Sequence, residues 1–375
     1  MKQLLKKVIK REYQPLNTVE ISKNRLIANY KYLSSLDKKI KIAPVLKSNA
    51  YGHGIVEVGT ILDKLEPVFF CVDSIFEAYQ LLNRKIKTSI LITGYVNPKN
   101  LLTKRLPFSY SVCELEQLRG ILNSQPQAKV HLFVDTGMHR EGVRVDELEG
   151  LLKKLNRKEI NSIDGLMSHL AFAENPTNID TKQQIGQFQL AIQLLKKYSI
   201  FPKFIHFGNS SGILNDKSLR LSTYTNVVRT GLALYGISSV KSVGLKPVLQ
   251  LKTHVVQVKK IKKDEKVGYD FTYQAKKDSL IAVLPIGYND GIDRRLSDKS
   301  VIMIGDKPCP IIGRVSMNLT VVDVSTVINI KVGNEAIVFS NIENENNIVN
   351  SAKKIGAIPY ELLVHLDRST KRKII

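Results

Sequence analysis

Cysteine is scarce in this chain of 375 residues, which contains only three. Cys71, Cys113 and Cys309 lie far apart, are odd in number, and in two cases fall within apparent strands. Small secreted proteins that depend on disulfides instead carry an even, dense set of cysteines. We therefore expect buried free thiols and a reducing, cytoplasmic location.

Long apolar runs are also missing. No stretch approaches the roughly 20 residues that a membrane-spanning helix needs, so we expect no membrane association. The opening stretch MKQLLKKVIKREYQ has scattered charges and lacks the apolar centre of a secretory signal. Internal repeats and low-complexity tracts are absent too. An apolar content of 43% is ordinary for a globular protein.

Acidic residues are few relative to basic ones, at 34 against 56, and the formal net charge is +22. Such an excess can indicate a nucleic-acid-binding protein. However, the lysines spread over nearly every expected helix, and the dense patches at Lys259–Lys266 and Lys371–Lys373 lack interleaved aromatic residues. We therefore interpret the charge as a lysine-rich, solvated surface that attracts small anions.

Strand-like apolar runs alternate with helical stretches over residues 22–240, which predicts a (β/α)8 TIM barrel. The whole chain is too long for a typical single core, so a second, smaller domain is expected. The eight predicted barrel strands are Ile42–Leu46, Val68–Val72, Ser89–Thr93, Phe108–Val112, Val130–Asp135, Ile163–His169, Phe204–Phe207 and Val227–Leu234.

The pattern changes over residues 241–375, where Leu249–Val255 alternates apolar and polar residues and helical periodicity returns only near Ile348–Ile355. These features predict a mainly antiparallel β domain, which we expect the N-terminal segment 1–21 to join through a strand at Thr18–Ile21. Further strands are predicted at Leu280–Pro285, Val301–Ile304, Ile311–Val324 and Glu335–Ser340.

The motif KIAPVLKSNAYGHG ends a buried strand in Lys47, then breaks into small residues and glycines. Active sites of (β/α)8 barrels lie at the carboxyl ends of the strands. A lysine held there can act as a base or form a Schiff base, although lysines at element ends are usually solvated.

Other reactive side chains recur where barrel strands end: Arg140, His169 and Ser210. Singly, such residues are commonly a surface arginine, a core histidine and a helix cap. Arg229 differs, because it lies in an apolar run where a buried guanidinium needs an acceptor. Their joint position at one rim of the barrel favours a functional site.

These segments resemble those of alanine racemases, the fold-type III pyridoxal-phosphate enzymes. VLKSNAYGHG is similar to the cofactor-lysine motif of the family. The similarity extends along essentially the whole chain through DTGMHREG, SHLAFAE, HFGNSSG, NVVRTGLALYG, VGYDFTYQA, PIGYNDGIDRR and GRVSMN. The resemblance implies a racemase that interconverts L- and D-alanine with pyridoxal 5'-phosphate and no metal. It also implies a role in supplying D-alanine for peptidoglycan.

The resemblance further implies that Lys47 carries the cofactor as an internal aldimine and serves as one base on the external aldimine of the substrate. Tyr269 matches the second base, which in this family comes from the partner subunit. Racemisation needs acid–base groups on opposite faces of the substrate. We therefore expect a homodimer with active sites shared between subunits.

The remaining site residues also follow from the resemblance. Arg229 matches the arginine that faces the pyridine nitrogen, with His169 supporting it. Because arginine does not readily release a proton, that nitrogen stays unprotonated and the ring is a weaker electron sink. The residues that match phosphate ligands are Tyr51, Ser210, Gly231 and Tyr360. Those that match substrate-contacting or entrance residues are Arg140, Met317, Tyr288, Asn318 and Arg294.

Two positions depart from the family pattern. Phe133 occupies the place of a lysine that is often carbamylated, so we expect Arg140 to lack anionic support from a protein carboxylate, and either to bind an anion or to be loosely held. Asn318 replaces the usual aspartate after Met317. An amide can donate a hydrogen bond and carries no charge, so a preference for serine or another small amino acid is an alternative.

Three further alternatives remain. A fold-type III decarboxylase would share the barrel and Lys47 but would release CO2. A non-catalytic pyridoxal-phosphate carrier would bind the cofactor without turnover. A nucleic-acid-binding module would show salt-sensitive binding and no cofactor; we rank it last.

Overall fold

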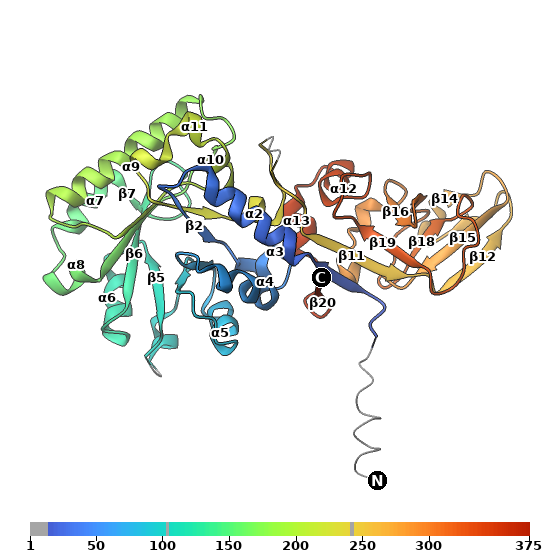
Figure 1. Ribbon diagram of the computed structural model, residues 1–375, viewed down its shortest axis with the longest axis horizontal. Helices are drawn as coiled ribbons and strands as arrows, with labels where there is room; N and C mark the ends of the chain where they lie inside the picture. The colour runs from blue at the N-terminus through green and yellow to red at the C-terminus, as the bar shows by residue number, and fades with distance from the viewer. Residues whose placement is uncertain (1–13, 103–104, 241–243) are drawn as a thin grey trace, which may run out of the picture. The chain divides into compact units, whose positions relative to one another are not determined.

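The computed structural model describes residues 14–102, 105–240 and 244–375 (Figure 1). Residues 1–13 lie outside this described part. They include most of the opening stretch considered for a secretory signal and the first part of the segment 1–21 that we expected to join the β domain. The chain forms two compact units: Ser22–Val248, here called the barrel unit, and Leu249–Ile375 with strand β1 (Thr18–Ile21), here called the β unit.

The boundary between the units falls later in the chain than the expected position after Val240. Asn29 explains this, because its side chain accepts a hydrogen bond from Lys246 N–H (2.9 Å) and donates one to Lys246 O (2.8 Å). Val248 N–H also donates to Tyr235 O at 3.2 Å. The segment that follows the last barrel strand is therefore tied back to the barrel.

The barrel unit confirms the predicted (β/α)8 fold. Its parallel strands run in the order β2-β10-β9-β8-β6-β5-β4-β3, and a parallel bridge between Val45 and Cys71 joins the two ends of that order. The strands are β2 (Lys41–Pro44), β3 (Phe70–Val72), β4 (Ile90–Ile92), β5 (Phe108–Val112), β6 (Lys129–Asp135), β8 (Ile163–Met167), β9 (Phe204–His206) and β10 (Val227–Thr230), with the short β7 (Val143–Arg144) beside β6.

Helices lie around the outside of these strands (Figure 1). Their apolar positions face the sheet, as Leu26 and Leu33 of α2 show by being fully buried. The helices are α2 (Lys23–Leu36), α4 (Ile55–Leu62), α5 (Ile75–Asn83), α6 (Leu115–Ser124), α7 (Val145–Leu152), α8 (Arg157–Ser162), α9 (Ile179–Lys197), α10 (Ser210–Leu214) and α11 (Asp216–Leu219). The short element α3 (Lys47–Tyr51) is a turn with left-handed backbone angles.

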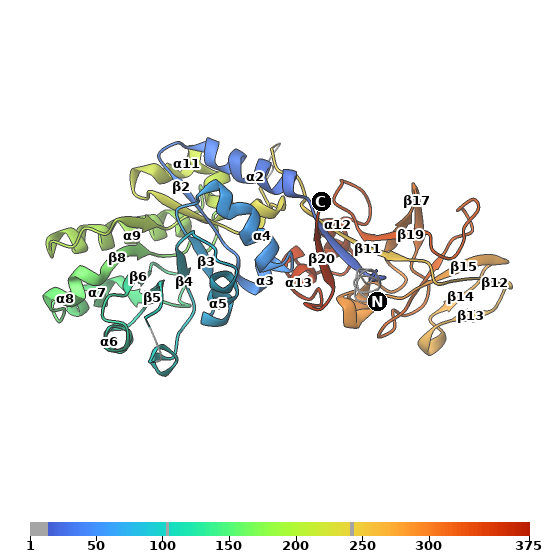
Figure 2. The ribbon, with the colours of Figure 1, turned by 60° about the horizontal axis from the view of Figure 1, so that its bottom comes forward.

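The β unit contains a six-stranded sheet in the order β17-β16-β19-β11-β1-β20, a three-stranded sheet β12-β15-β18 and the pair β13-β14. Figure 2 shows β12 to β15 together at one end of this unit. The elements are β11 (Leu249–His254), β12 (Gln257–Ile261), β13 (Lys266–Val267), β14 (Tyr273–Gln274), β15 (Ser279–Leu284), β16 (Val301–Ile304), β17 (Lys307–Pro310), β18 (Thr320–Asp323), β19 (Glu335–Phe339), α12 (Ile348–Lys354), α13 (Pro359–Val364) and β20 (Lys371–Ile374).

Some local predictions in the β unit were wrong. The run expected at Ile311–Val324 is not one strand, because Thr320–Asp323 forms β18 and a loop separates it from Ile311, which pairs back to Val322 as an isolated antiparallel bridge. Gly313, at φ +70°, starts this loop, and a Cβ there would lie 2.6 Å from Val267 O. Helix α13 was not expected.

The lysine-rich patch at Lys259–Lys266 overlaps the end of strand β12, and the patch at Lys371–Lys373 lies within strand β20. Strand β20 pairs in parallel with β1.

The three cysteines are unpaired, as predicted; Cys71 and Cys309 are also buried as predicted, whereas Cys113 is only partly buried. Burial raises the pKa of Cys71 to about 12, which keeps this thiol protonated and unreactive. Within the described ranges, no helix combines the length and apolarity required to cross a bilayer.

Candidate active site

Lys47 opens a turn with an unusual backbone conformation just after strand β2. The next four residues, Ser48 to Tyr51, all have φ between +52° and +55°. Non-glycine residues in this left-handed region cost roughly 1–2 kcal/mol each, so the surrounding structure must hold the turn. Part of that support is Asn49, whose Oδ1 accepts a hydrogen bond from Ile55 N–H at 2.9 Å.

The Lys47 ammonium lies at the carboxyl end of β2, as the sequence predicts. Its Nζ is 3.9 Å from Asp73 Oδ1, and the side chain is 40% exposed. Asp73 follows directly after strand β3, which is joined to β2 by the bridge that closes the barrel. The lysine is therefore half-buried beside a carboxylate that the sequence analysis did not single out.

Arg229 on β10 is buried, and its terminal nitrogens are fully used by the protein. NH1 donates to His206 Nδ1 (2.7 Å) and His206 O (2.9 Å). NH2 donates to Ser168 O (2.5 Å) and lies 3.2 Å from His169 Nδ1. The Nε–H group of Arg229 makes no hydrogen bond to any residue in the described part of the chain.

His206 on β9 continues this network into the barrel interior. Because Arg229 can only donate, His206 Nδ1 accepts and the proton of His206 lies on Nε2. His206 Nε2 is 2.6 Å from Nδ1 of His131 on β6. Burial, reinforced by the charge of Arg229, lowers the pKa of His131 to about 3 and places that of His206 well below its usual value. Both rings are therefore neutral supports for the arginine.

Burial, then the charges of Arg229, Arg140 and Lys47, also lower the pKa of His169 to about 3. A neutral His169 can accept from the guanidinium without adding positive charge to the site. The burial of Arg229 lowers its own pKa to about 10, so the guanidinium stays protonated at neutral pH.

Ser210, Gly231 and Tyr51 form a small polar cluster beside Arg229. Ser210 Oγ accepts hydrogen bonds from Gly231 N–H (3.0 Å) and Ala233 N–H (3.3 Å), which leaves its own O–H to donate. A Cβ on Gly231 would lie 2.6 Å from the Tyr51 hydroxyl oxygen, so only glycine permits this approach. Hydroxyl groups gathered around a glycine in this way fit a phosphate group.

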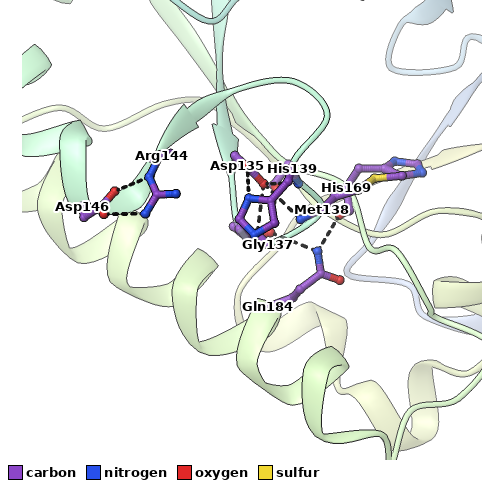
Figure 3. Close-up of polar contacts among 10 residues, drawn as sticks. Asp135, Gly137, Met138, His139, Arg144, Asp146, His169 and Gln184 are labelled. Carbon is purple, nitrogen blue, oxygen red and sulfur yellow. Dashed lines mark hydrogen bonds and ion pairs between the residues drawn. The ribbon is translucent and has the colours of Figure 1, made fainter.

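The loop after strand β6 carries Arg140. Asp135 Oδ1 accepts from the backbone N–H groups of Gly137 (2.9 Å), Met138 (3.0 Å) and His139 (3.1 Å), as Figure 3 shows. The same figure shows Gln184 of α9 donating to His169 O at 3.2 Å. Helix α9 thus fixes the His169 backbone.

The expectation that Arg140 lacks a protein carboxylate was wrong. Its Nε lies 3.5 Å from Oε2 of Glu141, the next residue in the chain. The two side chains are 53% and 44% exposed, so the pair is solvated and weak. Phe133 itself is buried in strand β6 and, being uncharged, cannot form an ion pair with Arg140.

The β unit presents the other predicted residues. Tyr269 is 67% exposed and sits in a turn in which Gly268, Asp270 and Phe271 have positive φ. Asp270 Oδ2 anchors that turn, because it is 2.6 Å from Arg314 Nε.

Arg294 lies 4.0 Å from the same Asp270 carboxylate. Tyr288 and Met317 are 45% and 55% exposed, and the Asn289 N–H donates to Met317 O at 2.9 Å, so their loops are neighbours. Asn318 is exposed in the same loop, and Tyr360 on α13 is 40% exposed.

The structure thus brings His169 to Arg229, and Ser210 and Tyr51 to Gly231, within the barrel unit. Tyr269, Tyr288, Met317, Asn318 and Tyr360 belong to the β unit instead. Sequence reasoning missed His206 and Asp73. Both had a signal available, because each lies at or directly after the end of a barrel strand, where functional side chains collect.

Comparisons with known proteins agree with this architecture. Residues 21–239 match the family described as alanine racemase, N-terminal domain, and residues 248–374 match alanine racemase, C-terminal domain. Alanine racemase of Borreliella burgdorferi is 33% identical over 96% of this chain and 97% of its own length. That of Sorangium cellulosum is 32% identical over 89% of this chain and 91% of its own length.

Solved structures are similar over nearly the full chain. Alanine racemase from Bacillus anthracis with bound L-Ala-P has a TM-score of 0.87 at 26% identity, covering 97% of this chain and 96% of that one. Alanine racemase of Clostridium difficile in complex with cycloserine has a TM-score of 0.85 at 28% identity, covering 97% and 96%. This chain therefore belongs to the alanine racemase family of pyridoxal-phosphate enzymes, whose members interconvert L- and D-alanine.

Proposed function

We propose that this chain racemises alanine with pyridoxal 5'-phosphate, and that Lys47 and Tyr269 are its two bases. The observation that carries the proposal is the arrangement in the barrel unit. Lys47 leaves β2 on a strained turn, and buried Arg229 spends its terminal nitrogens on the protein while its Nε–H remains for a ligand. When bound, the cofactor supplies an electron sink that acidifies the α-proton of the amino acid.

Two bases are needed because the proton leaves one face of the α-carbon and returns on the other. The Lys47 amino group, held near Asp73, would bind the cofactor and, as the neutral amine, take up the proton on one face. Tyr269 would transfer it on the opposite face. Its exposed hydroxyl-bearing ring, on a turn pinned by Asp270, suits donation to a site completed by another chain.

Arg229 would set the electronic character of the reaction. Its Nε–H would donate to the pyridine nitrogen, and a permanently charged guanidinium would not transfer a proton there. An unprotonated ring nitrogen limits how long negative charge resides on the α-carbon, which favours prompt reprotonation over side reactions. His169 and His206 would orient the guanidinium from two sides.

The remaining residues would bind the ends of the cofactor and substrate. Hydroxyl donors that suit the phosphate are those of Tyr51, Ser210 and Tyr360, and Gly231 would contribute the N–H that donates to Ser210 Oγ in this structure. Arg140 would bind the substrate carboxylate, which must compete with Glu141 for the guanidinium. Met317 and Tyr288 would line the entrance.

The proposal includes a homodimer in which Tyr269 of one subunit completes the site of the other. The β unit supports this, because apolar side chains near Tyr269 and Met317 in the sequence are exposed, including those of Phe271 (66%) and Leu319 (45%). Unpaired cysteines support a cytoplasmic location. A supply of D-alanine for peptidoglycan would be the physiological role.

The test is loss of optical rotation of L-alanine by purified, cofactor-loaded protein, run beside Lys47→Ala and Tyr269→Phe. We expect racemisation by the unmodified chain and a loss of at least about 1000-fold in each variant, because each lacks one of the two proton-transfer groups. Borohydride should attach the cofactor to Lys47 and not to Lys47→Ala. Release of CO2 without racemisation would contradict the proposal and favour a decarboxylase.

Asn318 makes serine a second candidate substrate. Its neutral amide, exposed beside Met317, can donate to a hydroxyl where a carboxylate only accepts. We expect Asn318→Asp to lower the ratio of kcat/KM for serine to that for alanine by about fivefold to tenfold, the value of one hydrogen bond. An unchanged ratio would remove Asn318 from the determinants of specificity.

A further inference from the structure

The turn that carries Lys47 needs an anchor for its first backbone groups. Ser48 and Asn49 adopt left-handed conformations that neither residue prefers in isolation. The carbonyl groups of both residues are bonded within the turn, since Gly52 N–H donates to Ser48 O at 3.1 Å and Gly54 N–H donates to Asn49 O at 2.9 Å. Their N–H groups are held by a side chain from another helix.

That side chain is Glu77 of α5, which is buried with 7% exposure. Glu77 Oε1 accepts a hydrogen bond from Ser48 N–H at 2.7 Å and a longer one from Asn49 N–H at 3.4 Å. Glu77 Oε2 accepts from Asp73 N–H at 2.9 Å. Hydrogen bonds to a buried carboxylate are stronger than neutral ones, so this group is a firm anchor.

The sequence around Glu77 predicts a different role. Ser74 and Glu77 have the spacing of a capping box, and the Ser74 side chain does accept from Glu77 N–H at 3.3 Å. In a capping box the glutamate carboxylate would return to the cap residue's own N–H. Here the carboxylate instead bonds to Asp73 and to Ser48.

Glu159 provides an internal comparison. It occupies the third position of α8, is 4% exposed, and completes a full capping box with Asn156: Asn156 N–H donates to Glu159 Oε2 at 2.8 Å. Its carboxylate also accepts from Arg119 at 2.8 Å and contacts none of the residues around Lys47. The two buried glutamates therefore share a helix position but differ in what they hold.

We propose that Glu77 is a positioning residue for Lys47. One carboxylate fixes the backbone immediately after the lysine and, through its other oxygen, the backbone of Asp73, whose side chain lies 3.9 Å from the lysine ammonium. Glu77 thereby sets both the direction in which Lys47 leaves β2 and the place of its carboxylate neighbour. The inference rests on the proposed role of Lys47 as a base.

The experiment compares Glu77→Gln with Glu159→Gln in the full chain. The amide introduced by Glu77→Gln keeps one acceptor oxygen, but its NH2 group must face the backbone N–H of either Ser48 or Asp73. One of the two backbone anchors around Lys47 is therefore lost, while side-chain volume is kept. We expect kcat for L-alanine to fall about 100-fold in Glu77→Gln with KM changed less than about threefold, because a misplaced base costs turnover more than binding. In Glu159→Gln we expect a lower Tm and kcat within about twofold of the unmodified chain.

Hydrogen exchange of the cofactor-free proteins gives a readout that does not depend on turnover. The Ser48 and Asn49 amides should exchange at least about tenfold faster in Glu77→Gln than in the unmodified chain, and unchanged in Glu159→Gln. Adding Ser48→Gly to Glu77→Gln should restore part of kcat, because glycine adopts positive φ without strain. A role confined to capping α5 would give no such rescue.

Three results would overturn the proposal. They are equal effects of the two glutamine variants on kcat, an absence of rescue by Ser48→Gly, and rapid exchange of Ser48 N–H in the unmodified cofactor-free protein. The last needs no variant to fold. If the unmodified chain failed to racemise alanine, the proposed function would fail while the exchange data still decided whether Glu77 holds the turn.

Discussion

Among single residues, Gly231 shows most directly how the lack of a side chain shapes the barrel site. The space that its Cβ would occupy is filled by the Tyr51 hydroxyl, and its N–H donates to Ser210 Oγ. Glycine is required here for close approach, because a Cβ would lie 2.6 Å from the Tyr51 hydroxyl oxygen. The hydroxyls proposed to bind phosphate therefore depend on an absent side chain.

Gly231→Ala should weaken pyridoxal-phosphate binding by at least about tenfold, because the new methyl group must displace the Tyr51 hydroxyl. Equilibrium dialysis of the cofactor measures this. The control is Gly150→Ala in helix α7, where a Cβ meets nothing within 4 Å. That variant should bind the cofactor normally and gain about 0.5–1 kcal/mol of stability. Equal cofactor affinity in both variants would contradict the role of Gly231.

Among the elements, strands β6 and β9 bring His131 and His206 together inside the barrel. The two rings meet edge to face among aromatic residues, with Phe69 edge-on to both and Phe204 stacked on His131. Their hydrogen bond places an acceptor where Arg229 needs one. The arginine is thus oriented by a chain of neutral groups across three strands.

This pair predicts a pH dependence of stability. The folded-state pKa values of both histidines lie below the unfolded value near 6.5, that of His131 at about 3, so the unfolded chain binds more protons between these limits. The free energy of unfolding should therefore fall as pH drops below 6.5, by up to about 1.4 kcal/mol per pH unit for each histidine. Above 6.5 the two histidines should contribute no slope.

Urea unfolding at about pH 6.5 and about pH 5 measures that slope. His131→Gln keeps an acceptor for His206 but cannot titrate, so its slope should be shallower by up to about 1.4 kcal/mol per pH unit. His365→Gln, at an exposed position of α13's C-cap, is the control and should leave the slope as it is. A variant of His131 with an undiminished slope would show that another group causes the pH dependence.

For the whole molecule, the two proposed bases lie in different units of the chain, and we propose that each active site is shared between two subunits. Lys47 and Tyr269 are each presented on a turn with positive φ, and each turn is anchored by a carboxylate. Such backbone strain concentrates at functional sites, where the surrounding structure enforces it. Two-fold symmetry would give each dimer two such sites.

Mixing the inactive variants Lys47→Ala and Tyr269→Phe tests this sharing. After the subunits exchange, half of the dimers should be hybrids, and each hybrid should hold one site with both native bases. The mixture should regain about a quarter of the unmodified activity, because only one site in each hybrid is complete. Each variant exchanged with itself is the control. Failure to regain activity after proven exchange would place both bases in one subunit.

Periodicity alone was sufficient to predict the barrel. Most barrel strands are short, mainly apolar runs because both faces of the sheet are covered, and the helices show their own spacing, so the local pattern indicates the element. Strand β11 was equally readable, since its residues alternate between buried and half-exposed. The Lys47 motif could be placed at a strand end for the same reason.

Only the tertiary structure decided how the site is held together. The left-handed turn after Lys47 has no local signal, because its strain is balanced by Glu77, which lies 29 residues away from Ser48 in the sequence. The acceptor for Arg229 is His206, on a neighbouring strand, and the loop before β18 replaces a predicted strand where Gly313 meets Val267. The sequence determined the elements because apolar spacing is local. The site needed the fold because its hydrogen bonds join residues that only the closed barrel brings together.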